Sequence, residues 1–201
     1  MKKWLKVLCA VLVLSLLSGC SSSDSASKDK DDGKMTWKLA HIRPEGTRTD
    51  DSARWFSEEL KEKTDGRIEI EIYPNSELGD YTVVQERIGL GDVELQLASV
   101  GYNVDKTLAV QVAPYIVTDW EMAKRLYNIE DGLIANYVAD RLEDQNIKLL
   151  AVYPQYFGAV ALAKEPNDPY NPDVSKGLKI RVPSSKAWDA LGQGLGFQTT
   201  P

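Results

Sequence analysis

The stretch Arg67–Pro74, RIEIEIYP, decides the fold class of this 201-residue chain. Its three isoleucines occupy alternate positions, and two glutamates occupy the positions between them. Successive side chains of a β-strand point to opposite faces, so the pattern predicts a strand with one apolar and one polar face. The elements on either side of this strand then set the fold class.

A helix precedes the strand. Ala53, Phe56 and Leu60 recur with helical spacing and lie on one helical face. Thr49 or Asp50 can cap the first turn, because short polar side chains accept hydrogen bonds from the free backbone N–H groups there. We therefore expect a helix followed by the strand of residues 67–74.

Strand and helix patterns alternate along the rest of the chain. Further strands are predicted at residues 36–42, 92–100, 147–154, 158–164 and 178–182, and further helices at residues 82–91, after Asp119 with a break at Asp131–Gly132, and from Ser184–Ser185. This alternation favours an α/β fold with largely parallel strands. The last residues, GLGFQTTP, begin another strand, which predicts that the sequence is a fragment of a longer protein.

The N-terminus has the pattern of an export signal. Lys2 and Lys3 precede an apolar run at residues 7–17, which is too short to span a bilayer and fits the core of a secretory signal peptide. The run ends in LSGC at Cys20, which resembles the lipobox of bacterial lipoproteins and predicts a lipid anchor on that cysteine. The alternative is an ordinary signal peptide with a chance cysteine. Residues 21–34 contain no large apolar side chain and are predicted to form a flexible tether.

Composition excludes several classes of function. The net charge of -6 argues against nucleic acid, because phosphate binding requires a basic face. The only cysteine besides Cys20 is Cys9, which lies in the predicted signal peptide, so no disulfide and no Cys/His zinc site are expected. No glycine-rich phosphate loop or nucleophile elbow occurs, and the single His41 gives a catalytic triad one candidate base. We therefore predict neither an enzyme nor a cofactor.

One charged residue lies where a ligand would bind. In KGLKIRVPSSKAW, residues 176–188, Arg181 is placed at the carboxyl end of a short strand that Pro183 terminates. Ligands of open α/β sheets bind at such strand ends, and His41 lies at the carboxyl end of the first predicted strand. Arg181 is either a solvated residue of an edge strand or a group that binds an anion.

Five segments together resemble one family. LAHIRPEGT, EELKEKTDGRIEIEIYPNSELGD, GLGDVELQLAS, APYIVTD and KGLKIRVP occur in the order and spacing of the DctP family, the solute receptors of tripartite ATP-independent periplasmic (TRAP) transporters. The resemblance covers residues 37–201, about the first half to two thirds of a usual member. Each segment is weakly specific by itself, and the five in register make a specific match.

The resemblance implies a two-lobed fold of the type II periplasmic-binding-protein kind, with the second lobe incomplete. On this basis residues 1–19 are the signal peptide, residues 20–34 the lipidated cysteine and tether, residues 35–152 the first lobe with part of the connecting region, and residues 153–201 the start of the second lobe. A member of this family binds a small organic acid and delivers it to a membrane permease. Alternatives are a receptor for an ABC importer or a sensor kinase, and a secreted α/β enzyme acting on an acidic substrate.

The resemblance also implies site residues. Arg181 matches an arginine that forms a bidentate salt bridge with the ligand carboxylate, while Ser99 and Tyr81 match positions lining the pocket. His41 lies beside a turn that lines the pocket in relatives, and Tyr102 and Tyr156 are aromatic candidates from position alone. Val160 stands where members often have a second arginine, which argues against a dicarboxylate or a sialic acid and favours a monocarboxylate held by Arg181.

Overall fold

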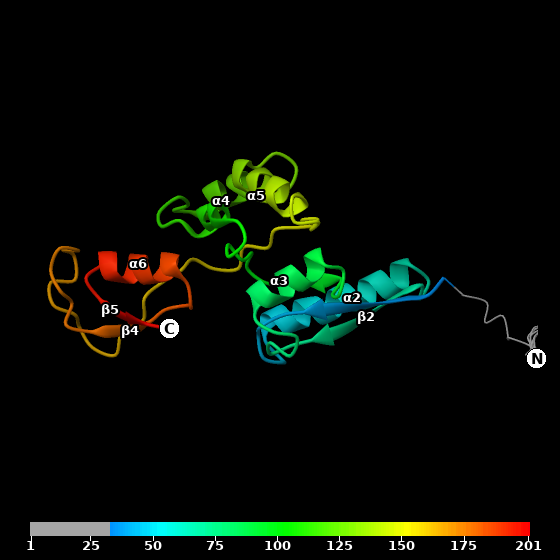
Figure 1. The fold of residues 1–201 in the computed structure, drawn as a ribbon, viewed down its shortest axis with the longest axis horizontal. Helices are drawn as coiled ribbons and strands as arrows, with labels where there is room; N and C mark the ends of the chain where they lie inside the picture. Colours follow the sequence, from blue (N-terminus) through cyan, green and yellow to red (C-terminus); the bar gives the residue numbers. More distant parts are fainter. Residues whose placement is uncertain (1–32) are drawn as a thin grey trace, which may run out of the picture.

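The computed structural model describes residues 33–201, so the predicted signal peptide, Cys20 and most of the predicted tether lie outside the described residues. The elements are β1 (Met35–Ala40), α2 (Arg48–Lys63), β2 (Ile68–Tyr73), α3 (Tyr81–Gly89), β3 (Leu95–Gln96), η1 (Lys106–Val112), α4 (Trp120–Leu126), α5 (Leu133–Glu143), β4 (Lys179–Arg181), α6 (Lys186–Gly194) and β5 (Gln198–Thr200). Figure 1 shows the described chain as an extended molecule with its two ends far apart.

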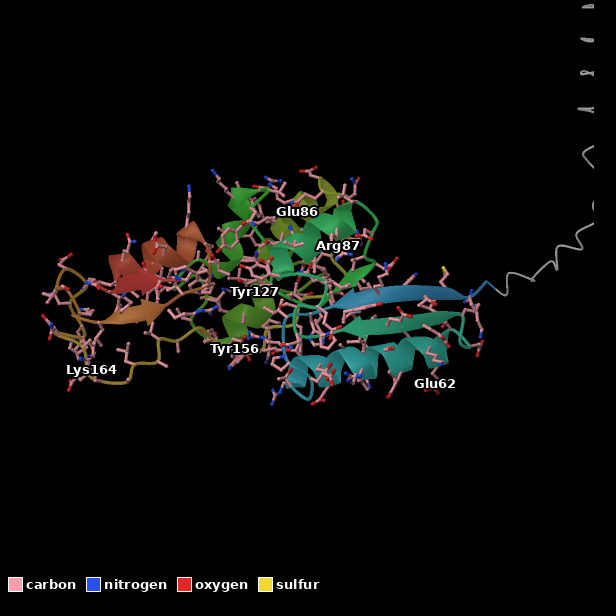
Figure 2. The ribbon with its side chains drawn as sticks, turned by 60° about the horizontal axis from the view of Figure 1, so that its bottom comes forward. Glu62, Glu86, Arg87, Tyr127, Tyr156 and Lys164 are labelled. Atoms are coloured by element: carbon pink, nitrogen blue, oxygen red, sulfur yellow. The ribbon has the colours of Figure 1, made fainter. Side chains whose placement is uncertain are left out.

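The first sheet confirms the predicted parallel arrangement. Its strands lie in the order β2-β1-β3, and β1 pairs in parallel with both neighbours. The six residues of β1 pair with the six of β2 from Met35 opposite Ile68 to Ala40 opposite Tyr73. Figure 2 shows this sheet between α2, which carries Glu62, and α3, which carries Glu86 and Arg87. The period-two stretch is therefore one strand of a covered α/β sheet.

A helical layer follows the first sheet in the chain. Leu108 of η1 forms a buried cluster with Ile134, Val138 and Leu142 of α5. The predicted break before α5 is confirmed, because α4 ends at Leu126 and α5 begins after Gly132. A Cβ on Gly132 would lie 2.5 Å from the backbone oxygen of Asn128, so the turn between the two helices has room only for glycine.

The last part of the chain forms a second small sheet. β4 and β5 pair in parallel, and α6 packs against them. The predicted helix start is confirmed, since Ser185 is the N-cap residue of α6 and its Oγ accepts a hydrogen bond from the backbone N–H of Trp188 at 3.4 Å. The strand predicted near the end of the sequence is β5.

Two of the predicted strands were wrong, at residues 147–154 and 158–164. Neither segment is part of a helix or a strand, and no backbone–backbone hydrogen bond forms at residues 148–166. Leu150 is 64% exposed and Val160 is 49% exposed. Apolar and β-branched residues favour strands, but a strand needs a neighbouring backbone for its ladder, and no described segment lies in register beside this one.

A third predicted strand was too long. Of residues 92–100, only Leu95–Gln96 pair, opposite Leu39 and Ala40 of β1. The chain then turns, and the side chain of Gln96 donates hydrogen bonds to the backbone oxygens of Tyr81 at 3.0 Å and Ser99 at 3.5 Å. These bonds tie the turn after β3 to the first residue of α3 and to the loop that carries Ser99. Across residues 33–201, no helix has both the length and the apolar character needed to cross a membrane.

Candidate functional site

The predicted site residues lie at the carboxyl ends of parallel strands. His41 directly follows β1, Ser99 lies three residues after β3, and Arg181 is the last residue of β4. Tyr81 is the first residue of α3. Since β1 and β3 are paired, the chain leaves them at the same edge of the first sheet, whereas β4 belongs to the second sheet.

Arg181 has a fixed backbone and a free side chain. Its Cα pairs with Thr200 of β5, and the backbone N–H of the next residue, Val182, donates to the Thr200 oxygen at 2.8 Å. The side chain is exposed, and no described residue forms a hydrogen bond or an ion pair with its guanidinium. The strand therefore holds an unpaired cation at its carboxyl end.

Three glutamine side chains hold the loop that carries Ser99 and Tyr102. Buried Gln85 of α3 accepts a hydrogen bond from the backbone N–H of Gly101 at 2.6 Å and donates to the Gly101 oxygen at 3.2 Å. Gln111 of η1 donates to the oxygen of Val100 at 2.9 Å, and Gln96 donates to that of Ser99. Each glutamine satisfies polar backbone groups that a loop cannot pair within itself, so the loop has a defined shape.

Two of the predicted tyrosines lie near each other and near the second sheet. Burial raises the pKa of Tyr81, with smaller contributions from neighbouring Tyr102 and Asp80. The Tyr102 hydroxyl is 2.5 Å from Oγ of Ser185, the N-cap residue of α6 and the fourth residue after Arg181. The structure thus brings Tyr81, Tyr102 and the segment after Arg181 together. Ser99 is exposed on the same loop as Tyr102.

His41 is placed differently from the expectation that it lines a pocket. Its residue is 2% exposed, and Nε2 lies 3.2 Å from Oδ1 of buried Asp50, while Nδ1 is buried without a partner. Asp50 Oδ2 accepts hydrogen bonds from the backbone N–H of Gly46 at 3.0 Å and from Nε of Arg54 at 2.9 Å. Because the imidazole presents no atom to the surface, the structure assigns it to holding the loop between β1 and α2.

The neighbours of Asp50 stabilise the charged form of its carboxylate. Burial by itself raises the pKa of Asp50, but the hydrogen bond from Arg54, then that from Gly46, then the charge of Arg54 and the bond to His41 together outweigh it. The pKa of Asp50 is therefore lowered from its ordinary value. This buried network fixes the loop that leaves the carboxyl end of β1.

Tyr156 contacts the same loop from outside. Its hydroxyl accepts a hydrogen bond from Nη2 of Arg43 at 2.6 Å, and the preceding Gln155 donates to Oγ1 of Thr49 at 3.4 Å. Phe157 packs edge-on against Trp120 with ring centroids 4.9 Å apart. Residues 155–157 therefore lie against elements of the predicted first lobe, although the predicted boundary places them after it. Figure 2 shows Tyr156 in the middle of the described chain.

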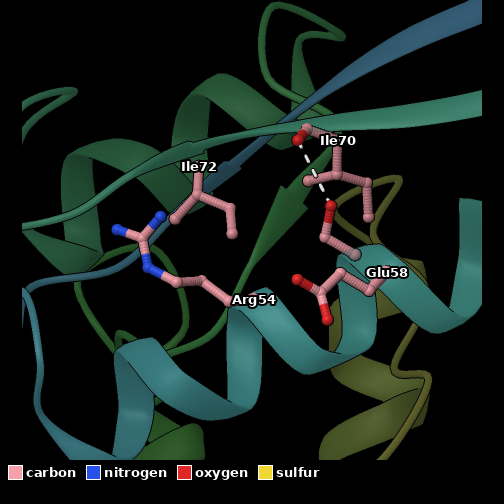
Figure 3. A pocket seen from close by; sticks show the side chains of 5 residues that line it. Arg54, Glu58, Ile70 and Ile72 are labelled. Atoms are coloured by element: carbon pink, nitrogen blue, oxygen red, sulfur yellow. Dashed lines mark hydrogen bonds between the residues drawn. The ribbon is translucent and has the colours of Figure 1, made fainter.

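A hollow at the surface lies elsewhere, between α2 and β2. It has a volume of about 240 Å³ and is lined by Arg54, Ser57 and Glu58 of α2 and by Ile70 and Ile72 of β2. Figure 3 shows these side chains facing one another across the helix–strand gap, where the Ser57 hydroxyl donates to the oxygen of Ile70. None of the predicted site residues lines it, so this hollow is part of the packing between α2 and β2. In residues 33–201 no group of three His, Cys, Asp or Glu side chains is arranged to hold a metal ion.

Sequence reasoning missed two residues of this region, Arg43 and Ser185. Arg43 stands between His41 and Pro44 in a segment that was already singled out, and its charge was the available signal. Ser185 was predicted as a helix start. Nothing in the sequence around it indicates that its hydroxyl forms a hydrogen bond with a tyrosine more than eighty residues earlier in the chain. Such long-range pairing is visible only in the folded chain.

Known proteins share the sequence pattern and the fold. Residues 39–201 match the family model described as bacterial extracellular solute-binding protein, family 7, or DctP. A solute-binding protein of Chromohalobacter salexigens is 27% identical over 194 residues, which are 96% of this chain and 54% of the relative. The C4-dicarboxylate-binding periplasmic protein DctP of Rhodobacter capsulatus is 30% identical over 163 residues, 79% of this chain and 47% of the relative.

Solved structures agree with the fold. A TRAP periplasmic solute-binding protein of Chromohalobacter salexigens with bound D-glucuronate superposes with a TM-score of 0.63 at 26% identity, over 82% of this chain and 54% of that one. One from a Polaromonas species bound to D-erythronate gives a TM-score of 0.67 at 22% identity, over 84% and 55%. These structures have the two-lobed fold that the sequence predicted. The chain spans about half the length of the relatives it matches.

Proposed function

The chain belongs to the DctP family of bacterial extracellular solute-binding proteins, and on that premise we propose that it recognises a small organic acid outside the cytoplasm. The family is one of binding proteins, which supports a receptor without enzymatic activity. In this proposal the receptor delivers its ligand to the membrane permease of a TRAP-type transporter.

The unpaired guanidinium of Arg181 carries the proposal. A guanidinium fork matches a carboxylate in two parallel hydrogen bonds and keeps its charge at every physiological pH. Several other arginines of the described chain have acceptors, as Arg54 does in Asp50 and Arg87 in Asp92, whereas Arg48 and Arg125 share the unpaired state of Arg181 but do not lie at the end of a strand. At Arg181 no acceptor is present among residues 33–201, so its donors are available to an external anion.

The ligand class follows from the relatives and from Val160. The relatives named above bind a C4-dicarboxylate and D-glucuronate, which have a carboxylate in common. Val160 offers no charge for a second acidic group and is half-exposed in an extended segment. A single carboxylate held by Arg181 is therefore the proposed recognition element, with Tyr81 and Ser99 lining the site and Tyr102 supporting it. In this proposal Tyr156 and His41 stabilise the loop after β1 and do not contact the ligand.

The proposed location is the outer face of a membrane. Residues 1–19 would be removed as a signal peptide, Cys20 would carry the lipid anchor, and residues 20–34 would tether the receptor. Residues 35–152 would form the first lobe and residues 153–201 the start of the second. The relatives are periplasmic by name, which supports export.

A panel of carboxylates tests the proposal. The melting temperature of the protein is measured with D-glucuronate, L-gulonate, succinate and pyroglutamate, each with its uncharged amide or alcohol as a control. A ligand at a hundred times its Kd stabilises the fold by about 2.7 kcal/mol, which is a measurable shift.

Variants then assign the site. Arg181→Ala should abolish the shift, because it removes both donors and charge, and Arg181→Lys should weaken it, because an ammonium does not form the fork. Lys179→Ala is the matched control, since it removes a positive charge from the same exposed face of β4. Equal binding by Arg181→Ala and wild type contradicts the role of Arg181, and the absence of any shift over the panel contradicts the ligand class.

A further inference from the structure

We propose that the hydrogen bond between Tyr102 and Ser185 is the tie that sets the position of the second sheet, and hence of Arg181, relative to the first part of the molecule. It makes Tyr102 a positioning residue whose hydroxyl is already engaged, instead of a direct contact of the ligand. The inference rests on the proposed function only where Arg181 is taken as the group that binds the carboxylate.

The Tyr102 end of the tie is held firmly. The ring packs against the buried cluster of Leu108, Ile134, Val138 and Leu142. The backbone just before it is held by Gln85 at Gly101 and by Gln111 at Val100. A tyrosine with its ring in a core and its backbone pinned can point its hydroxyl in one direction, so little entropy is lost when the hydroxyl bonds.

The Ser185 end is equally well placed. Ser185 caps α6, and its backbone N–H donates to the oxygen of Pro183 at 2.7 Å. Two residues before Pro183 lies Arg181, whose backbone is paired with β5. A displacement of Ser185 therefore moves the cap of α6 and the end of β4 together. The hydroxyl accepts from the N–H of Trp188, and its own proton or that of Tyr102 completes the short bond.

No other polar contact links the two parts. Among the described residues, no further hydrogen bond or ion pair joins residues 34–164 to residues 165–201. The connecting stretch at residues 148–166 forms no backbone–backbone hydrogen bond, so by itself it does not fix an orientation. Loss of one hydroxyl should therefore release the second sheet as a unit while each part keeps its own fold.

Interspin distances test the tie without any ligand. Spin labels are placed on the full chain at Glu86→Cys of α3 and Ala190→Cys of α6, both exposed, in a background in which Cys9 and Cys20 are replaced by serine. The parent should give one narrow distance distribution. Tyr102→Phe, which keeps the ring in the core and the cap on α6, should broaden it several-fold, and Ser185→Ala should do the same.

Matched variants separate the tie from the helix cap. Ser185→Thr keeps both the hydroxyl and the cap and should retain the narrow distribution. The double variant Tyr102→Phe/Ser185→Ala should be no broader than Tyr102→Phe alone, because both changes remove one bond. A Tyr102→Phe distribution that superimposes on that of the parent overturns the inference, as does additive broadening in the double variant.

A binding measurement then connects the tie to the site. With D-glucuronate as the probe, Tyr102→Phe should raise Kd about tenfold and leave the preference for the acid over its amide unchanged. A loss of that preference would make Tyr102 a ligand contact and contradict the positioning role. If the wild type binds none of the carboxylates, the proposed function fails, whereas the interspin distances still decide whether the tie exists.

Discussion

Residues 67–74 and residues 147–164 both carry strand signals in the sequence, and only the first forms a strand. The first stretch alternates isoleucine with glutamate and becomes β2, paired over six residues with β1, whereas the second contains near-continuous apolar runs and forms no ladder with any described segment. Figure 1 shows β2 alongside β1, whereas the chain between α5 and β4 has no strand beside it and contacts its surroundings through side chains such as Tyr156 and Phe157. A strand-favouring composition therefore marks a segment that can pair, and the neighbouring backbone decides whether it becomes a strand.

The sharpest test of this contrast is amide hydrogen exchange. Amides of β1 and β2 are hydrogen-bonded within a covered sheet and open only with the fold, whereas those of residues 148–164 have no backbone acceptor. We expect exchange in the second stretch to be faster by about a thousandfold or more. Exchange measured by mass spectrometry after peptic cleavage reads both regions in one sample. Comparable protection in the two would mean that the second stretch pairs in solution.

The same substitution should have unequal effects in the two regions. Leu39→Ala removes a buried side chain from β1 and should cost about 3 kcal/mol of unfolding free energy, because it leaves a cavity between the helices and the sheet. Leu150→Ala, in the unpaired stretch, should change it by less than about 0.5 kcal/mol, because that side chain is already largely exposed. Urea unfolding followed by circular dichroism measures both, and equal losses would remove the distinction.

The stability of the first sheet also depends on the buried carboxylate of Asp50, which holds the loop between β1 and α2. Asp50→Asn should cost about 2 kcal/mol at neutral pH, because it weakens the charge-assisted bonds from Arg54 and Gly46. Since the folded pKa of Asp50 is lowered, its contribution is complete above the ordinary value of 3.8 and is lost as the pH falls below that value through the lowered one.

The control for this prediction is Asp51→Asn, which removes an exposed carboxylate from the same helical turn. Urea midpoints taken from pH 7 to pH 3 should fall more steeply for the wild type than for Asp50→Asn, and Asp51→Asn should follow the wild type. Parallel curves for the wild type and Asp50→Asn would show that the network contributes no pH dependence.

The smallest effect is expected where α2 meets β2 at the surface. Lys61 and Glu69 form an ion pair of 2.9 Å with both side chains about half exposed. Lys61→Ala should change the unfolding free energy by less than about 0.5 kcal/mol, because water and salt screen exposed pairs. A larger loss in the same urea experiment would mean that this ion pair contributes substantially to holding α2 against β2.

Much of the fold was predictable because its signals are local. The presence of α2, the break at Gly132 and the cap at Ser185 each follow from the preferences of a few consecutive residues. The predicted cap of α2 at Thr49 or Asp50 was wrong, because the N-cap residue is Thr47 and Asp50 bonds to Gly46 and Arg54 instead. The extent of β3 was not predictable, because the chain turns after Gln96, whose side chain bonds to the backbone oxygens of Tyr81 in α3 and of Ser99 in the loop. The strands expected at residues 147–164 failed for the related reason that pairing is a property of two segments.

The candidate site divides in the same way. The position of Arg181 at a strand end, the alternation of its strand and the resemblance of the five segments to one family were all properties of the sequence by itself. Only the tertiary structure decided that His41 is buried against Asp50, that Tyr156 bonds to Arg43, and that Tyr102 reaches Ser185. Backbone preferences act over a few residues, whereas burial and side-chain pairing depend on segments that meet only after the chain has folded.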